Sequence, residues 1–514
     1  MVNPATPLRV VIVGADVATL TLALLFEHAG IDYVLLESCD SVPVVAGGMT
    51  LHPTVLPLLE QLSLRDDLFF FSQPMEQVLI LDAEMEYISA YDWSDRQARY
   101  GAWSRFISRP EYCAMILEKL PESRVLFNKM VTSVTTKEDD DDDDDDGNGF
   151  DNDYGNDKFS QHNNNNDSRQ DSMLDSDDEK KSEARGVSVE CADGLVYCGH
   201  LLIGDINSDV ERKLLYTSGG NGNTVATRSE SLREIEDRLG SSARDITARE
   251  SHYHVSGITE VLDPQRIPLL KDDKTELRLV LDNKSSLSWW AATLVDNRIA
   301  WQVSRRVVLP EKSSRPTVDF GSSFRNHYHQ HQHHHEQAAT ASVINQISQN
   351  MMCPLGGTMA QLLNWTPQSQ ISCKRWDDRR APTVPVLGQP GEDTILDALA
   401  LSEVLFSMPS TRLNDIHRAF DRYHKERTSR RESAISESRE LDQTLHAKGS
   451  LRRLYRSFIL NCTPKYIHDR KSDEKYAYRP QATFLQRVPD YGRVQPNPSS
   501  YSRRYSSGGG REKS

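Results

Sequence analysis

The stretch RVVIVGADVATLTLALLFEHAGIDYVLLE, from Arg9 to Glu37, decides the fold of this chain. It begins with a β-branched apolar run, passes through Gly14 into an apolar helix-forming segment, and ends after Gly30 in a second apolar run. This order predicts a strand, a tight turn, a helix and a second strand, which together form the βαβ unit that binds dinucleotides. We therefore expect an α/β fold that begins with this unit.

The turn departs from the G-x-G-x-x-G pattern of such units, because Asp16 and Thr19 stand at the positions of the second and third glycines. An aspartate beside a pyrophosphate costs about 1–4 kcal/mol. A loss of that size weakens binding roughly ten- to a thousandfold. In an alternative interpretation, Asp16 is the N-cap of the helix and accepts a hydrogen bond from the free amide of Ala18 or Thr19.

Glu37 ends the second apolar run, 23 residues after Gly14. An acidic side chain at this place accepts hydrogen bonds from a ribose, and it favours a nucleotide without a 2′-phosphate. Glu37 could equally end a strand at the surface without contacting any ligand. The residues alone leave both interpretations open.

The chain has 514 residues, which is enough for two or three domains. Its formal net charge is −15, but nineteen acidic and five basic residues between Glu138 and Arg185 account for −14 of it. This segment contains eight consecutive aspartates and too few apolar residues to form a core, so we expect it to be disordered. The negative net charge comes almost entirely from this one segment, and we predict no nucleic-acid partner.

Seven cysteines without a C-x-x-C pair argue against a disulfide framework and a structural zinc site. This favours a reducing compartment, and we predict a cytoplasmic location. The histidine-rich tract at 327–337 and the aspartate run predict solvated loops, so we predict no metal site. The basic segment GSLRRLYRSFIL is amphipathic, and we favour packing on the protein over peripheral membrane contact.

Two turn signals predict hairpins. Asp193-Gly194 joins two short apolar runs, and the segment RVLFNKMVTSVTT, residues 124–136, predicts one strand beside them. Asp296-Asn297 joins two longer runs, the first of which contains Trp289-Trp290. Aromatic residues on a strand are typical of a core, and we favour that position over the lining of a ring pocket.

The order of these segments resembles a fungal branch of the FAD-dependent aromatic monooxygenases, the family of p-hydroxybenzoate and salicylate hydroxylases. GGMTLHPTVLPLLEQLSL resembles the glycine loop and helix near the flavin, and SRPEYCAMILEKL resembles the segment whose arginine contacts the cofactor. WDDRRAPTVPVLGQPGEDTILDALAL resembles the third motif, which contains G-D-A-x-H and G-Q-G. The resemblance implies that the cofactor-binding residues are Gly14, Ala15, Glu37, Gly48, Arg109, Asp378 and Gly388.

The resemblance also implies an architecture. It predicts a Rossmann-like FAD-binding domain of three layers, in the order ββα, and an inserted substrate domain with a mixed sheet. The FAD-binding domain would comprise residues 1–215 and 366–430, and the substrate domain residues 216–365. A helical region would follow at 431–490, and a disordered tail at 491–514.

The function implied by the resemblance is that of an FAD-dependent monooxygenase. It would use NADH or NADPH and O₂ to hydroxylate an aromatic or other small organic substrate, and no catalytic residue can be assigned. The third motif departs from the family, because Asp377, Ala381 and Pro390 replace a glycine, the histidine and the second glycine of G-Q-G. Together with Asp16 and Thr19, these departures support the alternative of a degenerate relative without catalysis that acts as a scaffold or interaction protein.

Overall fold

A computed structural model describes residues 8–43, 46–137, 186–204, 249–282, 287–309, 344–345, 347, 350–377, 389–445 and 465–497. The acidic segment, the histidine-rich tract, GSLRRLYRSFIL and the last residues of the predicted tail lie outside the described residues. So do the predicted cofactor residues Asp378 and Gly388.

The N-terminal stretch forms the predicted βαβ unit. Helix α1 (Val17–Ala29) connects two parallel strands and ends at Gly30, whose φ of 69° is left-handed. The parallel sheet has the order β11-β1-β2-β7, with β1 (Arg9–Val13), β2 (Asp32–Leu36), β7 (Val125–Leu126) and β11 (Leu201–Gly204). Its strands read as continuous apolar runs because both faces of the sheet are covered.

The two faces of this sheet pack against different layers. On β1, Val10 and Ile12 lie in the core shared with α1, whereas Val11 and Val13 lie in a core shared with a second sheet. That sheet is antiparallel with the order β10-β9-β8, and it contains β8 (Val131–Lys137), β9 (Gly186–Cys191) and β10 (Val196–Gly199). The predicted three-layer ββα arrangement is confirmed.

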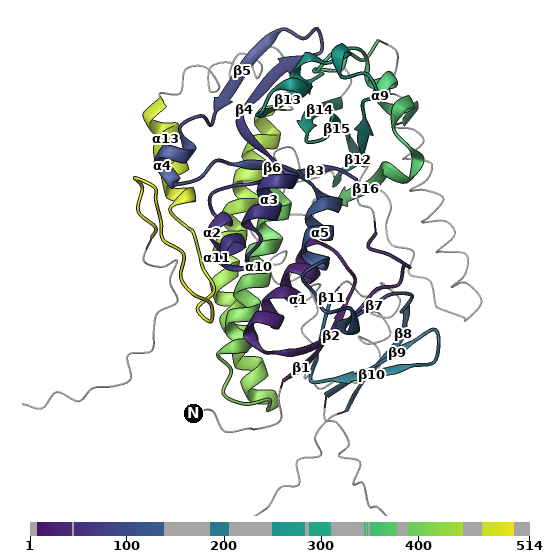
Figure 1. Cartoon of the computed structure of the whole chain (residues 1–514), viewed down its shortest axis with the longest axis vertical. Helices are drawn as coiled ribbons and strands as arrows, with labels where there is room; N and C mark the ends of the chain where they lie inside the picture. The colour runs from purple at the N-terminus through teal and green to yellow at the C-terminus, as the bar shows by residue number, and fades with distance from the viewer. Residues whose placement is uncertain are drawn as a thin grey trace, which may run out of the picture.

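A large mixed sheet forms the second part of the molecule (Figure 1). Its order is β16-β12-β15-β14-β13-β4-β6-β3, and β5 pairs with β4. The strands are β3 (Gly48–Leu51), β4 (Gln73–Asp82), β5 (Tyr87–Asp92), β6 (Arg105–Ser108), β12 (Arg249–Glu260), β13 (Thr275–Leu281), β14 (Leu287–Leu294), β15 (Arg298–Leu309) and β16 (Ile371–Asp377).

This sheet crosses the predicted domain boundaries. The strands β3 to β6 come from the segment predicted as FAD-binding, and β13 pairs with β4 in parallel. The strand β16 lies beyond the predicted boundary at residue 365 and pairs with β12. The order of apolar and polar residues along the sequence does not reveal such pairings, because each pairing joins strands that are more than a hundred residues apart.

The helices lie around these sheets. They are α2 (Leu56–Gln61), α3 (Arg65–Phe71), α4 (Arg96–Tyr100), α5 (Arg109–Leu117), α9 (Met359–Trp365), α10 (Gln389–Phe406), α11 (Leu413–Leu445) and α13 (Lys465–Tyr476). Short 3₁₀ turns occupy Glu122–Arg124, Pro264–Arg266, Pro268–Lys271 and Gln368–Gln370. The helix α10 packs on α1 with α11 behind it, as Figure 1 shows. Among the described helices, none is both long and apolar enough to cross a bilayer.

Both predicted hairpins are present, and one predicted strand is broken. Asp296 and Asn297 have φ values of 58° and 56°, as a tight turn between β14 and β15 requires. Residues 124–136 do not form the single predicted strand. Asn128 adopts a φ of 57°, so that β7 joins the parallel sheet and β8 the antiparallel one.

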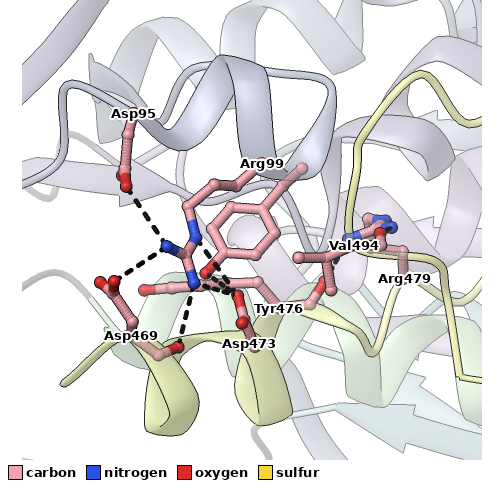
Figure 2. Close-up of polar contacts among 8 residues, drawn as sticks. Asp95, Arg99, Asp469, Asp473, Tyr476, Arg479 and Val494 are labelled. Carbon is pink, nitrogen blue, oxygen red and sulfur yellow. Dashed lines mark hydrogen bonds and ion pairs between the residues drawn. The ribbon is translucent and has the colours of Figure 1, made fainter. Parts of the chain in front are cut away.

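The C-terminal segment, residues 477–497, holds helices together that are far apart in the sequence. The Val494 amide donates to the Arg99 carbonyl of α4 over 2.8 Å, and the Thr483 amide donates to the Glu403 carboxylate of α10 over 2.6 Å. Arg479 is 1% exposed and pairs with Asp490 at 2.6 Å. Figure 2 shows Arg479 beside Val494, next to the ion pairs that join Arg99 to Asp469 and Asp473 of α13.

We expect Arg479→Met to lower the free energy of unfolding by about 3–5 kcal/mol, because it leaves the Asp490 carboxylate without its buried counter-ion. The matched control is Arg470→Met, which removes an arginine that is 81% exposed, and which should cost below about 1 kcal/mol. Urea unfolding measures both values. Equal losses in the two variants would show that Arg479 does not anchor the C-terminal segment.

Candidate functional site

The turn after β1 leaves open space beside its glycine. Gly14 has a φ of 91°, and a side chain built at this position would meet no atom within 4 Å. Its amide donates to the Leu36 carbonyl over 2.8 Å, which ties the turn to the end of β2. The glycine is needed here for its left-handed backbone, and the space beside it could receive a ligand.

Asp16 is the N-cap of α1, as one of the two interpretations of the sequence predicts. Its carboxylate accepts a hydrogen bond from the Thr19 amide at 2.9 Å, and the Thr19 hydroxyl accepts one from the Asp16 amide at 2.9 Å. The two residues therefore form a reciprocal capping box. The two departures from the glycine pattern are one structural unit, which stabilises the start of the helix.

Glu37 supports the turn from the end of β2. Its carboxylate is 3% exposed and accepts a hydrogen bond from the Ala15 amide at 2.7 Å. The other oxygen accepts from the Ser38 hydroxyl at 3.0 Å and the Cys39 amide at 2.9 Å. Glu37 is therefore not a surface strand end, and it has a structural role whether or not it also contacts a ribose.

The second glycine loop, residues 46–48, lies at the start of β3. A side chain at Gly48 would overlap the ring of Phe106, so that this glycine serves the packing of the loop on β6. Gly47 has a φ of 139°, and its carbonyl accepts a hydrogen bond from the Arg109 amide at 3.0 Å. The loop thus fixes the start of α5, which carries Arg109.

Arg109 is a half-buried cation, and its guanidinium forms no hydrogen bond or ion pair with any residue that the structure describes. Burial lowers the pKa of Arg109, whereas Cys113 and Asp16 raise it. A hydrogen bond of 3.1 Å between Thr21 and Tyr112 joins α1 to α5 and keeps Arg109 near the capped end of α1. A poorly solvated guanidinium without a partner is suited to an anionic ligand.

The start of α10 approaches the same loop. The helix begins at Gln389, directly after the segment that contains Asp378 and Gly388. A side chain at Gly391 would come within 2.8 Å of the Met49 sulfur in β3. The described part of the third predicted motif therefore begins beside the second glycine loop.

A patch of polar side chains on the large sheet was missed by the sequence analysis. His254, Gln302 and Ser304 are 4–7% exposed and bond to one another over 2.7–3.1 Å. On the same face, Ser256 donates to the Ala46 carbonyl over 2.7 Å, so the patch faces the second glycine loop. The residues come from β12 and β15, and only the strand register brings them together.

The two tryptophans lie in the core, on opposite faces of β14. The Trp289 indole donates to the Met352 carbonyl over 2.9 Å. The Trp290 indole is also buried, opposite Gln302 in the register, but its N–H has no acceptor within the described ranges. Trp290 stacks edge-on against Phe106, the ring that packs at Gly48. It thus places a donor without a partner on the face that carries the polar patch.

A surface cavity of about 420 Å³ lies elsewhere, beside β13. It is lined by Glu76, Leu269, Lys271, Asp272, Asp273, Lys274, Thr275, Glu276, Thr293 and Leu355. None of the predicted cofactor residues that the structure describes lines it. Charged side chains of both signs favour a solvated surface hollow, and we do not assign the site to it.

No family model matches the chain. Three curated proteins with similar sequences are fungal FAD-dependent monooxygenases. They are ctvC of Aspergillus terreus, 32% identical over 129 residues, atnA of Arthrinium, 28% identical over 137 residues, and pynG of Aspergillus niger, 24% identical over 258 residues. The matches cover 25%, 26% and 50% of this chain and 27%, 18% and 48% of the relatives. The chain thus spans less than half the length of each relative.

Solved structures with the same fold extend the comparison over most of the chain. HpxO of Klebsiella pneumoniae, complexed with FAD and uric acid, has a TM-score of 0.54 at 15% identity, over 91% of this chain and 96% of that one. CtdE, in complex with FAD and a substrate, has a TM-score of 0.51 at 12% identity, over 85% and 90%. The predicted fold is confirmed, and the sequence resembles FAD-dependent monooxygenases.

We expect Asp16→Ala to lower the free energy of unfolding by about 1 kcal/mol, because it removes the capping side chain. Asp16→Asn should stay close to the unaltered chain, since asparagine caps a helix as well as aspartate does. Thermal unfolding in parallel samples measures both. Stability that is the same in all three proteins would show that the capping box does not contribute.

Proposed function

We propose that this chain, whose sequence resembles fungal FAD-dependent monooxygenases, is such an enzyme. In this proposal it uses NADH or NADPH and O₂ to hydroxylate an aromatic or other small organic molecule in the cytoplasm. The observation that carries the proposal is the Arg109 guanidinium, which has no partner among the described residues and lies near the open turn at Gly14. An anionic group of a dinucleotide is the ligand that both features favour.

The described residues fit FAD. Gly14 and Ala15 would form the turn beside the nucleotide, Glu37 would accept from a ribose, and Arg109 would hold the phosphates. The capping box makes the amides of Asp16 and Thr19 less available for phosphate, since each already has a partner. Arg109 would supply the positive charge that the start of α1 supplies less well in this chain.

FAD, when bound, supplies the oxygen chemistry. The chain itself would bind the cofactor and the substrate, orient them, and exclude water from the site. The second glycine loop would lie between the cofactor and the large sheet, because Arg109 contacts one side of it and Ser256 the other. No catalytic residue is assigned to the hydroxylation step.

The polar patch and Trp290 support a neutral substrate. His254, Gln302 and Ser304 offer several hydrogen-bonding groups on one face, and none of them is a lysine or an arginine. The Trp290 N–H would gain an acceptor from a hydroxyl or carbonyl oxygen of the substrate. Neither feature would compensate a carboxylate, which requires a cation. We therefore place a neutral, oxygen-bearing organic molecule here.

The alternative of a scaffold without catalysis rests on the altered turn and third motif. Because Asp16 and Thr19 form a structural cap, their presence does not by itself indicate that cofactor binding or catalysis has been lost. The names of the similar proteins favour the flavoenzyme.

We expect Asp16→Asn to bind FAD about tenfold more tightly than the unaltered chain, because it keeps the cap and removes a negative charge near the phosphates. Arg109→Met should bind it at least tenfold more weakly, since it removes the cation. Quenching of flavin fluorescence measures both, with the exposed Arg65→Met as control. If both variants bind FAD with unchanged affinity, the cofactor does not bind at this turn.

In the FAD-loaded protein, we expect neutral phenols to stimulate NAD(P)H consumption more than phenols that carry a carboxylate. Trp290→Phe should raise KM for a neutral phenol about fivefold, the value of one hydrogen bond of about 1 kcal/mol. Trp289→Phe, on the opposite face, is the matched control and should leave KM unchanged. A preference for carboxylated phenols would contradict the assigned substrate class.

A further inference from the structure

A buried acid lies at the start of α10, next to the proposed flavin site. Glu392 is 4% exposed and accepts a hydrogen bond from the Thr54 hydroxyl. Its Oε1 atom is buried and has no hydrogen-bond partner among the residues that the structure describes. A buried carboxyl oxygen without a donor is costly to keep, which points to a role other than packing.

The surroundings of Glu392 are cationic. Arg96 of α4 is 4% exposed, lies between the rings of Trp93 and Tyr476 at 3.7 and 4.5 Å, and forms no ion pair within the described ranges. It donates to His52 over 2.8 Å and to the Tyr476 hydroxyl over 2.9 Å. Neither partner is a carboxylate. Burial lowers the pKa of Arg96, and Glu392 is a buried carboxylate that raises it.

Opposing effects act on the pKa of Glu392. Burial raises the pKa of Glu392 to about 7, from an ordinary value of 4.5. Lys475 and Arg96 oppose this rise, and Asp393 adds to it. Burial and the same two cations lower the pKa of His52 well below its usual range, so His52 stays neutral. The charged groups that act on Glu392 are therefore Arg96, Lys475 and Asp393, and the titratable His52 and Tyr476 lie behind them as partners of Arg96.

The cluster connects the proposed site to the surface. On one side, the neighbouring Gly391 packs on Met49, one residue from Gly48 of the second glycine loop. On the other side, Lys475 of α13 pairs with Glu437 at 3.4 Å, and the Glu437 side chain is 57% exposed. Glu392 thus lies between the loop that would contact the cofactor and groups in contact with water.

We propose that Glu392 exchanges protons between the proposed flavin site and solvent. The inference rests on the proposed function, whose net reaction is RH + O₂ + NAD(P)H + H⁺ → ROH + H₂O + NAD(P)⁺. Each turnover consumes one proton from solution. Glu392 releases its proton toward the site, its carboxylate is stabilised by Arg96 and Lys475, and it takes up a new proton from the side of Lys475 and Glu437.

The first test needs no cofactor. A buried acid with a raised pKa in the folded state holds a proton that the unfolded chain releases, so stability present below pH 4.5 is lost as pH rises through about 7. We expect Glu392→Gln to remove this loss, so that its melting temperature exceeds that of the unaltered chain above pH 7 but not near pH 4.5. An equal pH dependence in both proteins would overturn the proposal.

The second test uses the FAD-loaded protein. We expect kcat of the unaltered chain to fall above about pH 7, and kcat of Glu392→Gln to be lower by about a hundredfold at pH 6 and insensitive to pH. The matched control is Glu403→Gln, which replaces a half-buried acid of the same helix that Thr483 anchors. The control should keep the profile of the unaltered chain.

The two tests separate the possible failures. A melting-temperature effect together with an unchanged kcat profile would make Glu392 a structural acid and overturn its role in proton exchange. A chain that binds no FAD would overturn the proposed function, and the proton exchange with it, although the first test would still report the titration of Glu392.

Discussion

The hydrogen bond from the Ala15 amide to the Glu37 carboxylate is the interaction on which the proposed site depends. It joins the turn after β1 to the end of β2, and the bond from the Gly14 amide to the Leu36 carbonyl acts beside it. Because the turn is fixed, the N-cap Asp16 and the helix α1 that follows it have a defined orientation relative to the sheet. The bond between Thr21 and Tyr112 then places α5, and with it Arg109, at the same end of the sheet.

The altered glycine pattern has a different meaning in the structure than in the sequence. As a pattern, Asp16 and Thr19 are two independent losses in a phosphate-binding turn. In three dimensions they are the two halves of one capping box. The charge of Asp16 still opposes phosphate, but the nearby Arg109 offsets it. The altered turn therefore predicts weakened cofactor binding rather than a lost site.

Short stretches of sequence were sufficient to predict the strands and turns that form from neighbouring residues. The apolar run from Val10 to Val13 predicted β1, and Asp296-Asn297 predicted a hairpin because both residues tolerate a left-handed backbone. The resemblance correctly implied the three-layer ββα arrangement. Gly48 was predicted as a cofactor residue, and whether it contacts FAD stays a prediction, since the position is already explained by the Phe106 ring.

Non-local features could not be predicted from the sequence. Gln302 and His254 are 48 residues apart and meet only through the register of β12 and β15. The addition of β4 to β13 joins segments about 200 residues apart, so the mixed sheet does not follow the predicted domain boundaries. Glu392 was visible in the sequence only as one acid among many. Its burial beside Arg96 depends on α4, α10 and α13 meeting in space.

The most direct test of the central claim is a crystal structure of the chain grown with FAD. We expect the phosphates of FAD within hydrogen-bonding distance of the Arg109 guanidinium, a ribose at Glu37, and the capping box of Asp16 and Thr19 intact. A structure without bound FAD at saturating concentration, or with FAD bound away from Arg109, would contradict the account.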